Sequence, residues 1–142
     1  MTHPMLMNTK ANMRDPVFSW KGKKVLIVED DYVNYLYLHE ILSGVDTCLI
    51  RAVTLQEAFD MIAAAIGIDL IIINTGMPGN ESCRSVRRMK MLWPALRIIA
   101  IAGTACNGKN NHCHPSGCDA LISYRLEGED MLFVVGEVMK GS

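Results

Sequence analysis

The sequence has few aromatic residues and no excess of charge of either sign. Aromatic residues make up 6% of the 142 residues, and 14 basic residues face 15 acidic ones, so the net charge is -1. A nearly neutral chain has no bulk field to draw it to nucleic acid or to an anionic membrane, so any partner must recognise a patch. Half of the residues are hydrophobic, which is enough for one domain with a full core.

The amino-terminal stretch lacks the apolar core of a secretory signal, and the cysteines lack the even count of a disulfide framework. Residues 1–22 carry charges and prolines without periodicity, so we expect a loose arm that is neither signal peptide nor membrane anchor. Phe18 and Trp20 are candidates for attaching its end to the body. The five cysteines include Cys48 and Cys83 within predicted elements, which favours a reducing cytoplasm.

Beyond the arm, short apolar runs alternate with helical patterns. Strands are predicted at 24–28, 47–52, 70–74, 98–102 and 120–123, with helices at 32–43, 54–66, 80–93 and 131–139. Asp31 is the expected N-cap of the first helix, and Thr54 with Glu57 forms a capping-box pattern. Residues 106–117 are poor helix material, so a fourth helix before the last strand should be weak. The pattern predicts an α/β fold, a doubly wound five-stranded parallel sheet in three layers.

Polar side chains end the first and third predicted strands. Val28 leads into Glu29 and Asp30, and Ile73 leads into Asn74. Buried parallel strands deliver such residues to one edge of the sheet, where ligands bind at the switch point between strands one and three. We therefore expect both acids and the amide in one crevice.

Three stretches, 26–31, 69–78 and 117–119, resemble the receiver domains of bacterial two-component response regulators. The resemblance covers about residues 23–140, and the stretch 20–24 is similar to the linker that leads into receivers of hybrid sensor kinases. It implies a flavodoxin-like sheet of order 2-1-3-4-5. It also implies an amino-terminal arm (1–22) followed by a receiver domain (23–142).

The resemblance implies roles for the residues of the crevice. In receivers, an aspartate ending strand three accepts a phosphoryl group, and an acidic pair after strand one holds Mg²⁺. A hydroxyl ending strand four and a lysine ending strand five bind the phosphoryl group. The acidic pair corresponds to Glu29 and Asp30, and a third metal ligand corresponds to the backbone carbonyl of Gly76.

The remaining positions of the phosphorylation site depart from the family pattern. Asn74 stands at the phosphoacceptor position, and an amide offers no nucleophilic carboxylate oxygen. Ala102 stands at the hydroxyl position, although Thr104 is close enough in sequence to substitute after a loop shift. Tyr124, neutral at pH 7, stands at the lysine position. Leu121 replaces the aromatic switch residue of strand five.

Three expectations follow from these departures from the family pattern. Glu29 and Asp30 either bind Mg²⁺ weakly or remain as solvated relics, and no cofactor is required. Without the lysine, their repulsion should raise the pKa of one of them, unless Arg125 or Lys109 approaches the pair. Because Arg125 stands where the family has a cis proline, we also predict a trans peptide bond after Tyr124.

Other patterns have simpler explanations than a second site. A cluster of cysteine and histidine residues in 106–118 resembles a zinc site, but adjacent His-Cys-His residues cannot all face one ion. The basic residues of the third helix are explained better by a solvated face than by a nucleic-acid patch. They are Arg84, Arg87, Arg88 and Lys90. The acidic turn after the first strand argues against a dinucleotide or P-loop module.

We therefore predict a pseudo-receiver that is not an enzyme and that acts in the cytoplasm. It should bind a protein partner, either a sensor kinase, a phosphotransfer protein or a regulator, and neither nucleic acid nor membrane. The expected contact face comprises the fourth helix, fifth strand and fifth helix. The alternative is a phosphorylatable response regulator that uses Asp30 or Asp31, with Asn74 as an engineered or lineage-specific replacement.

Overall fold

The fold is described from a computed structural model in five segments, residues 20–64, 67–76, 81–102, 117–123 and 128–140. The predicted fourth helix, the cluster of cysteines and histidines up to residue 116, Thr104, Lys109, Tyr124 and the peptide bond to Arg125 lie outside these segments. None of the described helices is both long and apolar enough to cross a membrane.

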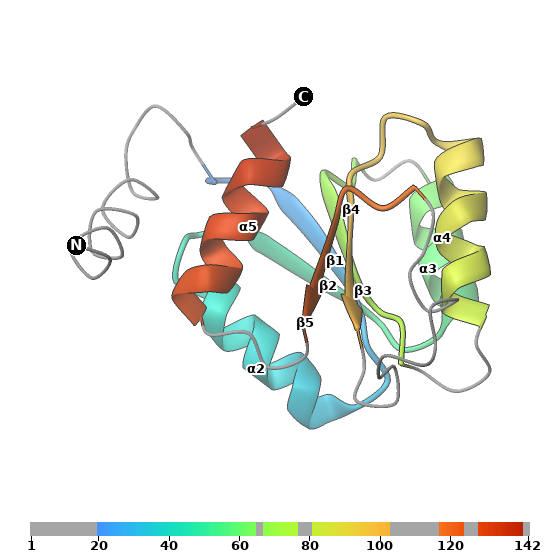
Figure 1. Ribbon diagram of the computed structural model, residues 1–142. Coiled ribbons are helices and arrows are strands. Elements are labelled where there is room, and N and C mark those ends of the chain that lie inside the picture. The colour runs from blue at the N-terminus through green and yellow to red at the C-terminus, as the bar shows by residue number, and fades with distance from the viewer. Residues whose placement is uncertain (1–19, 65–66, 77–80, 103–116, 124–127, 141–142) are drawn as a thin grey trace.

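Five parallel strands form one sheet in the order β2-β1-β3-β4-β5 (Figure 1), which confirms the predicted architecture. The strands are β1 (Lys24–Val28), β2 (Cys48–Ala52), β3 (Leu70–Asn74), β4 (Ile98–Ala102) and β5 (Ala120–Ser123). Only β2 differs from its predicted range, since it begins one residue later. Every residue of the central strand β3 is buried, which explains why its sequence is apolar until the last position.

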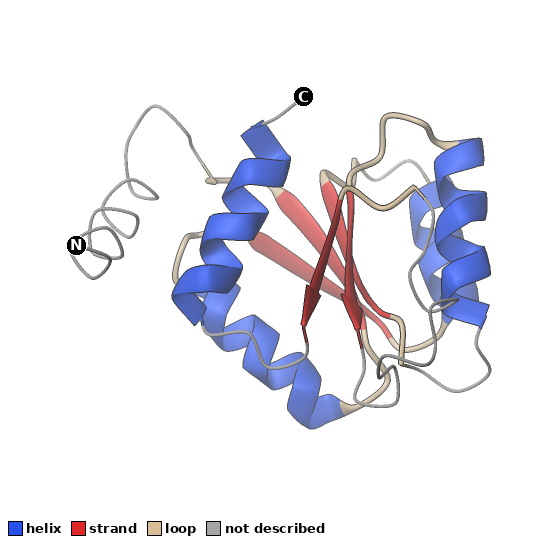
Figure 2. Ribbon diagram, in the orientation of Figure 1, coloured by secondary structure: helices blue, strands red, loops and turns tan. Residues whose placement is uncertain are grey.

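Four described helices cover the two faces of the sheet (Figure 2). They are α2 (Tyr32–Ser43), α3 (Leu55–Ala63), α4 (Glu81–Leu92) and α5 (Gly128–Lys140). Because side chains alternate along a strand, Ile72 of β3 packs toward α2 and α5, whereas Ile71 packs toward α3 and α4. The predicted helix of residues 54–66 is shorter in the structure, and the last helix begins earlier than its apolar pattern indicated.

Side chains fix the starts of two helices as the sequence predicted. The carboxylate of Asp31 accepts the backbone N–H of Val33 at 2.8 Å and so caps α2. The hydroxyl of Thr54 accepts the N–H of Glu57 at 3.1 Å. The carboxylate of Glu57 returns to the N–H of Val53 at 2.7 Å, one residue before the cap. The capping box is therefore present with its reciprocal bond displaced by one residue.

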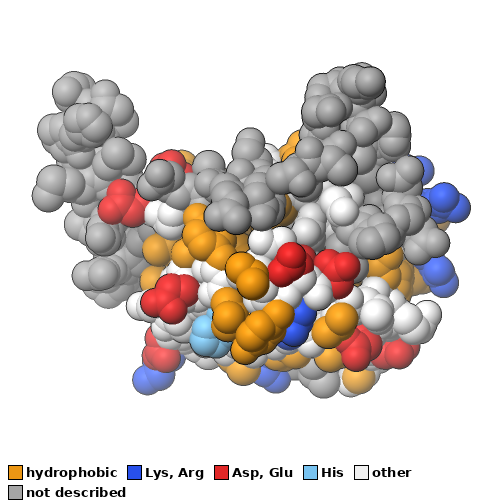
Figure 3. Space-filling model, turned by 90° about the horizontal axis from the view of Figure 1, so that it is seen from below, with side chains coloured by type: hydrophobic (Ala, Val, Ile, Leu, Met, Phe, Trp, Pro, Cys, Tyr) orange, Lys and Arg blue, Asp and Glu red, His pale blue; other side chains and the backbone are white. Residues whose placement is uncertain are grey.

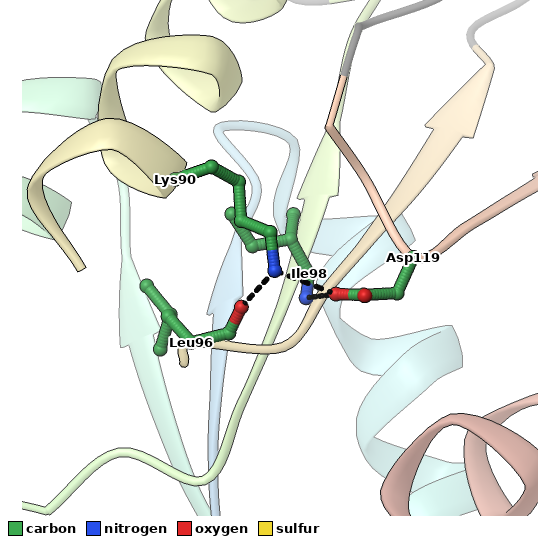
Figure 4. Close-up of polar contacts among 4 residues, drawn as sticks. All are labelled: Lys90, Leu96, Ile98 and Asp119. Atoms are coloured by element: carbon green, nitrogen blue, oxygen red, sulfur yellow. Dashed lines mark hydrogen bonds and ion pairs between the residues drawn. The ribbon is translucent and has the colours of Figure 1, made fainter. Parts of the chain in front are cut away.

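A lysine and an aspartate tie α4 to the starts of β4 and β5 (Figure 4). The ammonium group of Lys90 donates to the carbonyl of Leu96 and lies 3.2 Å from the carboxylate of Asp119. The same carboxylate oxygen accepts the N–H of Ile98 at 2.8 Å. Gly117, at a φ of +99°, lets the chain pass close to the lysine stem. Lys90 thus has a structural role and does not belong to a merely solvated face.

The end of the amino-terminal arm is attached to the domain through Trp20. Its side chain is 4% exposed and belongs to the core between the sheet, α2 and α5. A Cβ atom on Gly136 would lie 3.4 Å from the indole ring, so the glycine allows α5 to approach it closely. Trp20 therefore anchors the arm as expected, whereas Phe18 lies outside the described residues.

Candidate functional site

The polar crevice forms where β1 and β3 end side by side. The two strands pair in parallel with Val28 opposite Ile73, so the next residues, Glu29 and Asn74, emerge at the same edge of the sheet. Glu29 is 2% exposed and Asn74 is 9% exposed, whereas the neighbouring Asp30 is exposed. The sheet topology thus brings one buried acid against one buried amide.

The amide of Asn74 uses both of its ends in hydrogen bonds. Its nitrogen Nδ2 donates to Oε1 of Glu29 at 2.9 Å, and its oxygen Oδ1 accepts the backbone N–H of Gly76 at 2.8 Å. The second carboxylate oxygen of Glu29 accepts the N–H of Asp31 at 3.0 Å. One orientation of the amide satisfies both neighbours, and a carboxylate at position 74 could not donate to Glu29.

The crevice perturbs the ionisation of Glu29. Burial raises the pKa of this carboxyl above its ordinary value, and the negative charge of Asp30 acts in the same direction. Hydrogen bonds from the backbone of Asp31 and from the amide of Asn74 oppose the rise without cancelling it. A raised pKa within the acidic pair was expected from the repulsion between the two acids. The raised pKa belongs to Glu29, and burial contributes more to it than the charge of Asp30 does.

A cation from β2 supports the acidic loop, and sequence reasoning missed it. The guanidinium of Arg51 donates to the carbonyl of Glu29 at 3.1 Å and to that of Asp30 at 3.3 Å. It also lies over the rings of Tyr32 and Tyr35, 5.4 and 5.0 Å from their centroids. The available signal was an arginine inside an apolar strand, together with tyrosines one helical turn apart in the preceding helix.

Helix α2 exposes a hydrophobic surface on the face of the molecule drawn in Figure 3. Seen from below the view of Figure 1, hydrophobic side chains lie between acidic and basic ones. The exposed hydrophobic residues of α2 are Tyr32, Val33, Leu36 and Tyr37. The exposed surface of α2, the helix that begins directly after Asp31, is therefore unusually apolar for a solvated face.

Thr75 closes the crevice toward β4 and was also missed. Its side chain is 2% exposed, and both its hydroxyl and its N–H donate to the carbonyl of Ile101, at 2.9 and 2.8 Å. Ala102 ends β4 next to this contact and is half-buried, with only a methyl group to offer. Leu121 lies on β5 and is 37% exposed. A polar residue directly after an apolar run was the only sequence signal for Thr75.

The side chains as arranged do not fit a Mg²⁺ ion. Both carboxylate oxygens of Glu29 already accept N–H groups, and the oxygen of Asn74 accepts a third from Gly76. The amide faces Glu29 with its NH₂ group, which cannot ligate a cation. Mg²⁺ sites in proteins usually contain one or two carboxylates, and here the amide of Asn74 takes the place of one carboxylate and turns its NH₂ group toward Glu29. The geometry favours the cation-free alternative.

A doubly wound sheet with a polar crevice at its β1/β3 switch point defines a flavodoxin-like α/β domain. Comparison with solved structures narrows this class. A signal receiver domain of an HD-domain protein from Pseudomonas fluorescens Pf-5 superposes with a TM-score of 0.74 at 18% identity, over 85% of this chain and 97% of the other. A CheY-like receiver domain protein from Methanospirillum hungatei JF-1 gives 0.73 at 22% identity, over 85% and 96%.

A putative response regulator from Chloroflexus aurantiacus J-10-fl gives a TM-score of 0.74 at 20% identity, over 84% of this chain and 99% of the other. No family model and no curated protein matches the sequence. The chain therefore has the fold of response-regulator receiver domains, spanning nearly the whole length of each of these neighbours.

Proposed function

We propose that this protein is a pseudo-receiver, a receiver-type module of two-component signalling that acts through a protein partner and does not form an acyl phosphate at position 74. The observation that carries the proposal is the amide of Asn74, which bonds Glu29 and the N–H of Gly76 at the position where receivers carry the acceptor aspartate. It is a signal transducer and not an enzyme.

The chemistry of phosphoryl transfer supports this reading of the crevice. Acyl-phosphate formation needs an anionic carboxylate oxygen, whereas the lone pair of the Asn74 nitrogen is delocalised and its oxygen already accepts an N–H. Ala102 has no hydroxyl with which to bind a phosphoryl oxygen. The two described positions that would make and hold the modification are therefore both altered.

The hydrogen bonds of the crevice stabilise it without a bound cation. A pair of facing carboxylates would repel and would need a cation between them, but an amide donor next to Glu29 is attractive by itself. Arg51 and the N–H of Asp31 hold the acidic loop from the other side. The proposed module therefore keeps one arrangement of the crevice and signals through binding instead of through a phosphorylation switch.

The proposed partner surface lies along β5 and α5. Leu121 and Phe133 are 37% and 47% exposed there. A groove between the two elements is lined by Asp119, Ala120, Phe133, Val134, Glu137 and Val138. An apolar centre with acids at its border suits a protein partner, for which we propose a sensor kinase, phosphotransfer protein or regulator.

The proposed domain spans residues 23–142. Its proposed site of action is the cytoplasm, with which the free thiols of Cys48 and Cys118 agree.

Intact mass after incubation with acetyl phosphate and Mg²⁺ tests the proposal. We expect no phosphoryl adduct on the wild-type protein. A stoichiometric adduct would overturn the proposal, and its location by peptide mapping on Asp30 or Asp31 would establish the alternative of a phosphorylatable regulator. The variants Asp30→Asn and Asp31→Asn are the controls, because each removes one of the two candidate acceptors. Asp31 is the less available of the two because its carboxylate caps α2.

A further inference from the structure

A groove between α3 and α4 carries two arginines and an aromatic ring, on the face of the sheet opposite α2 and α5 (Figure 1). Its lining residues are Leu55, Gln56, Phe59, Arg84, Ser85 and Arg88. Sequence reasoning assigned the basic residues of α4 to a solvated helix face. The structure instead places two of them, one helical turn apart, along a depression with an apolar wall.

The ring of Phe59 orders one of these arginines. The guanidinium of Arg88 lies over this ring, 5.0 Å from its centroid, and the ring in turn packs at 6.1 Å against Trp93. A guanidinium stacked on an aromatic face loses little further freedom when it binds a ligand, and its edge keeps N–H donors for a carboxylate. Arg88 is therefore preorganised for an anionic group.

Two acids of α3 lie close in sequence to the groove, and each accepts a hydrogen bond. The carboxylate of Glu57 accepts the N–H of Val53 at 2.7 Å, and that of Asp60 accepts the side-chain amide of Gln56 at 3.0 Å. Neither acid lines the groove, and among the described residues neither Arg84 nor Arg88 forms an ion pair. No described carboxylate forms an ion pair with either arginine, so both guanidinium groups can pair with an anion from outside the chain.

We propose that the α3–α4 groove binds an acidic segment of a partner protein, with carboxylates on Arg84 and Arg88 and an apolar side chain against Leu55 and Phe59. Guanidinium groups pair with carboxylates through two parallel N–H···O bonds, and the apolar wall adds contact area that a bare anion could not use. This inference rests on the claim of the proposed function that the protein acts by protein binding, and it adds a second contact surface to the one proposed along β5 and α5.

Arg87 provides a matched control for the charge of the groove. It is exposed on the same helix but does not line the groove, so Arg87→Glu changes the net charge as much as Arg84→Glu or Arg88→Glu does. Circular dichroism and thermal melts of each variant show whether the fold is retained. If a glutamate variant does not fold, Arg84→Gln and Arg88→Gln replace it in the test, because they remove the positive charge without adding a negative one.

The test is an NMR titration of the full chain with a short blocked peptide of glutamates around one central phenylalanine. We expect shifts confined to α3 and α4, with affinity at least about tenfold lower in Arg84→Glu and Arg88→Glu and changed less than about twofold in Arg87→Glu. The same peptide with lysines for glutamates should not bind. Equal loss in all three variants, no shift in the groove, or tighter binding of an oligonucleotide would overturn the inference.

Failure of this titration is distinguishable from failure of the proposed function. The titration contains no phosphodonor, and the mass measurement contains no peptide. If the protein does not bind the peptide and is not modified by acetyl phosphate, the groove inference is wrong and the pseudo-receiver proposal stands. A protein that acquires a phosphoryl group loses the pseudo-receiver proposal, whatever the groove binds.

Discussion

Replacing Asn74 by aspartate should make the crevice sensitive to pH. In Asn74→Asp, an oxygen takes the place of the amide nitrogen that now lies 2.9 Å from Oε1 of Glu29. At that separation, two charges repel by about 6 kcal/mol at an effective dielectric of about 20. The repulsion is large enough that the pair should take up a proton in preference to remaining doubly ionised.

Proton uptake limits the cost of the substitution. Protonating a carboxyl of ordinary pKa 4.5 at neutral pH costs about 3 kcal/mol, at about 1.4 kcal/mol per pH unit. The folded variant then binds one more proton than the unfolded chain above that pKa, so its stability falls as pH rises. We expect Asn74→Asp to be about 3 kcal/mol less stable than the wild type near pH 7 and nearly equal near pH 4.5. Mg²⁺ should restore part of the loss near pH 7.

Urea unfolding followed by circular dichroism across this pH range measures the effect. Asn34→Asp is the control, because it makes the same amide-to-acid change in the partly exposed first turn of α2, where a negative charge is tolerated. The wild type should itself lose some stability as pH rises from 4.5, because the pKa of Glu29 is raised in the folded state. A difference between Asn74→Asp and the wild type that is the same near pH 4.5 and near pH 7 would refute the reasoning.

Three further substitutions test other contacts by the same unfolding measurement. Arg51→Ala should cost about 1–3 kcal/mol of stability, because the hydrogen bonds to the acidic loop and the stacking on the tyrosines are lost. Arg51→Lys should not recover this stability. A wild-type-like Arg51→Lys would show that charge alone matters. Asp119→Ala should cost about 1–3 kcal/mol because the N–H of Ile98 and the ammonium group of Lys90 both lose an acceptor, and Asp119→Asn should cost less. Trp20→Ala should cost about 3–5 kcal/mol, and a negligible loss would mean that the arm does not belong to the core.

The layered fold was predictable because its signals are local and strong. The run from Leu70 to Ile73 is apolar at each position, and such a segment has few places other than the centre of a sheet. Asp31 and Thr54 marked the starts of two helices through capping chemistry that needs only neighbouring residues. Strand ends and helix caps together placed Glu29 and Asn74 at one edge of the sheet.

The rest depends on contacts between residues far apart in the sequence. Arg51 reaches the loop after β1 from the strand next to it, and nothing near Arg51 in the sequence indicates that partner. In the sequence Lys90 cannot be distinguished from the other basic residues of α4, and only the fold shows that it pairs with Asp119. The groove of Arg84 and Arg88 likewise requires Phe59 from another helix. Pairings of this kind follow from side-chain geometry in three dimensions, which periodicity does not encode.

The central claim, that the crevice has no acceptor for a phosphoryl group, is tested most directly by NMR with Mg²⁺ and beryllium fluoride. This reagent reports on the crevice itself and needs no covalent product that could hydrolyse before it is weighed. For this protein we predict no change at the backbone amides of Gly76, Ala102 and Leu121 at any concentration of the reagent. Saturable shifts at these amides in the wild-type protein would contradict the account.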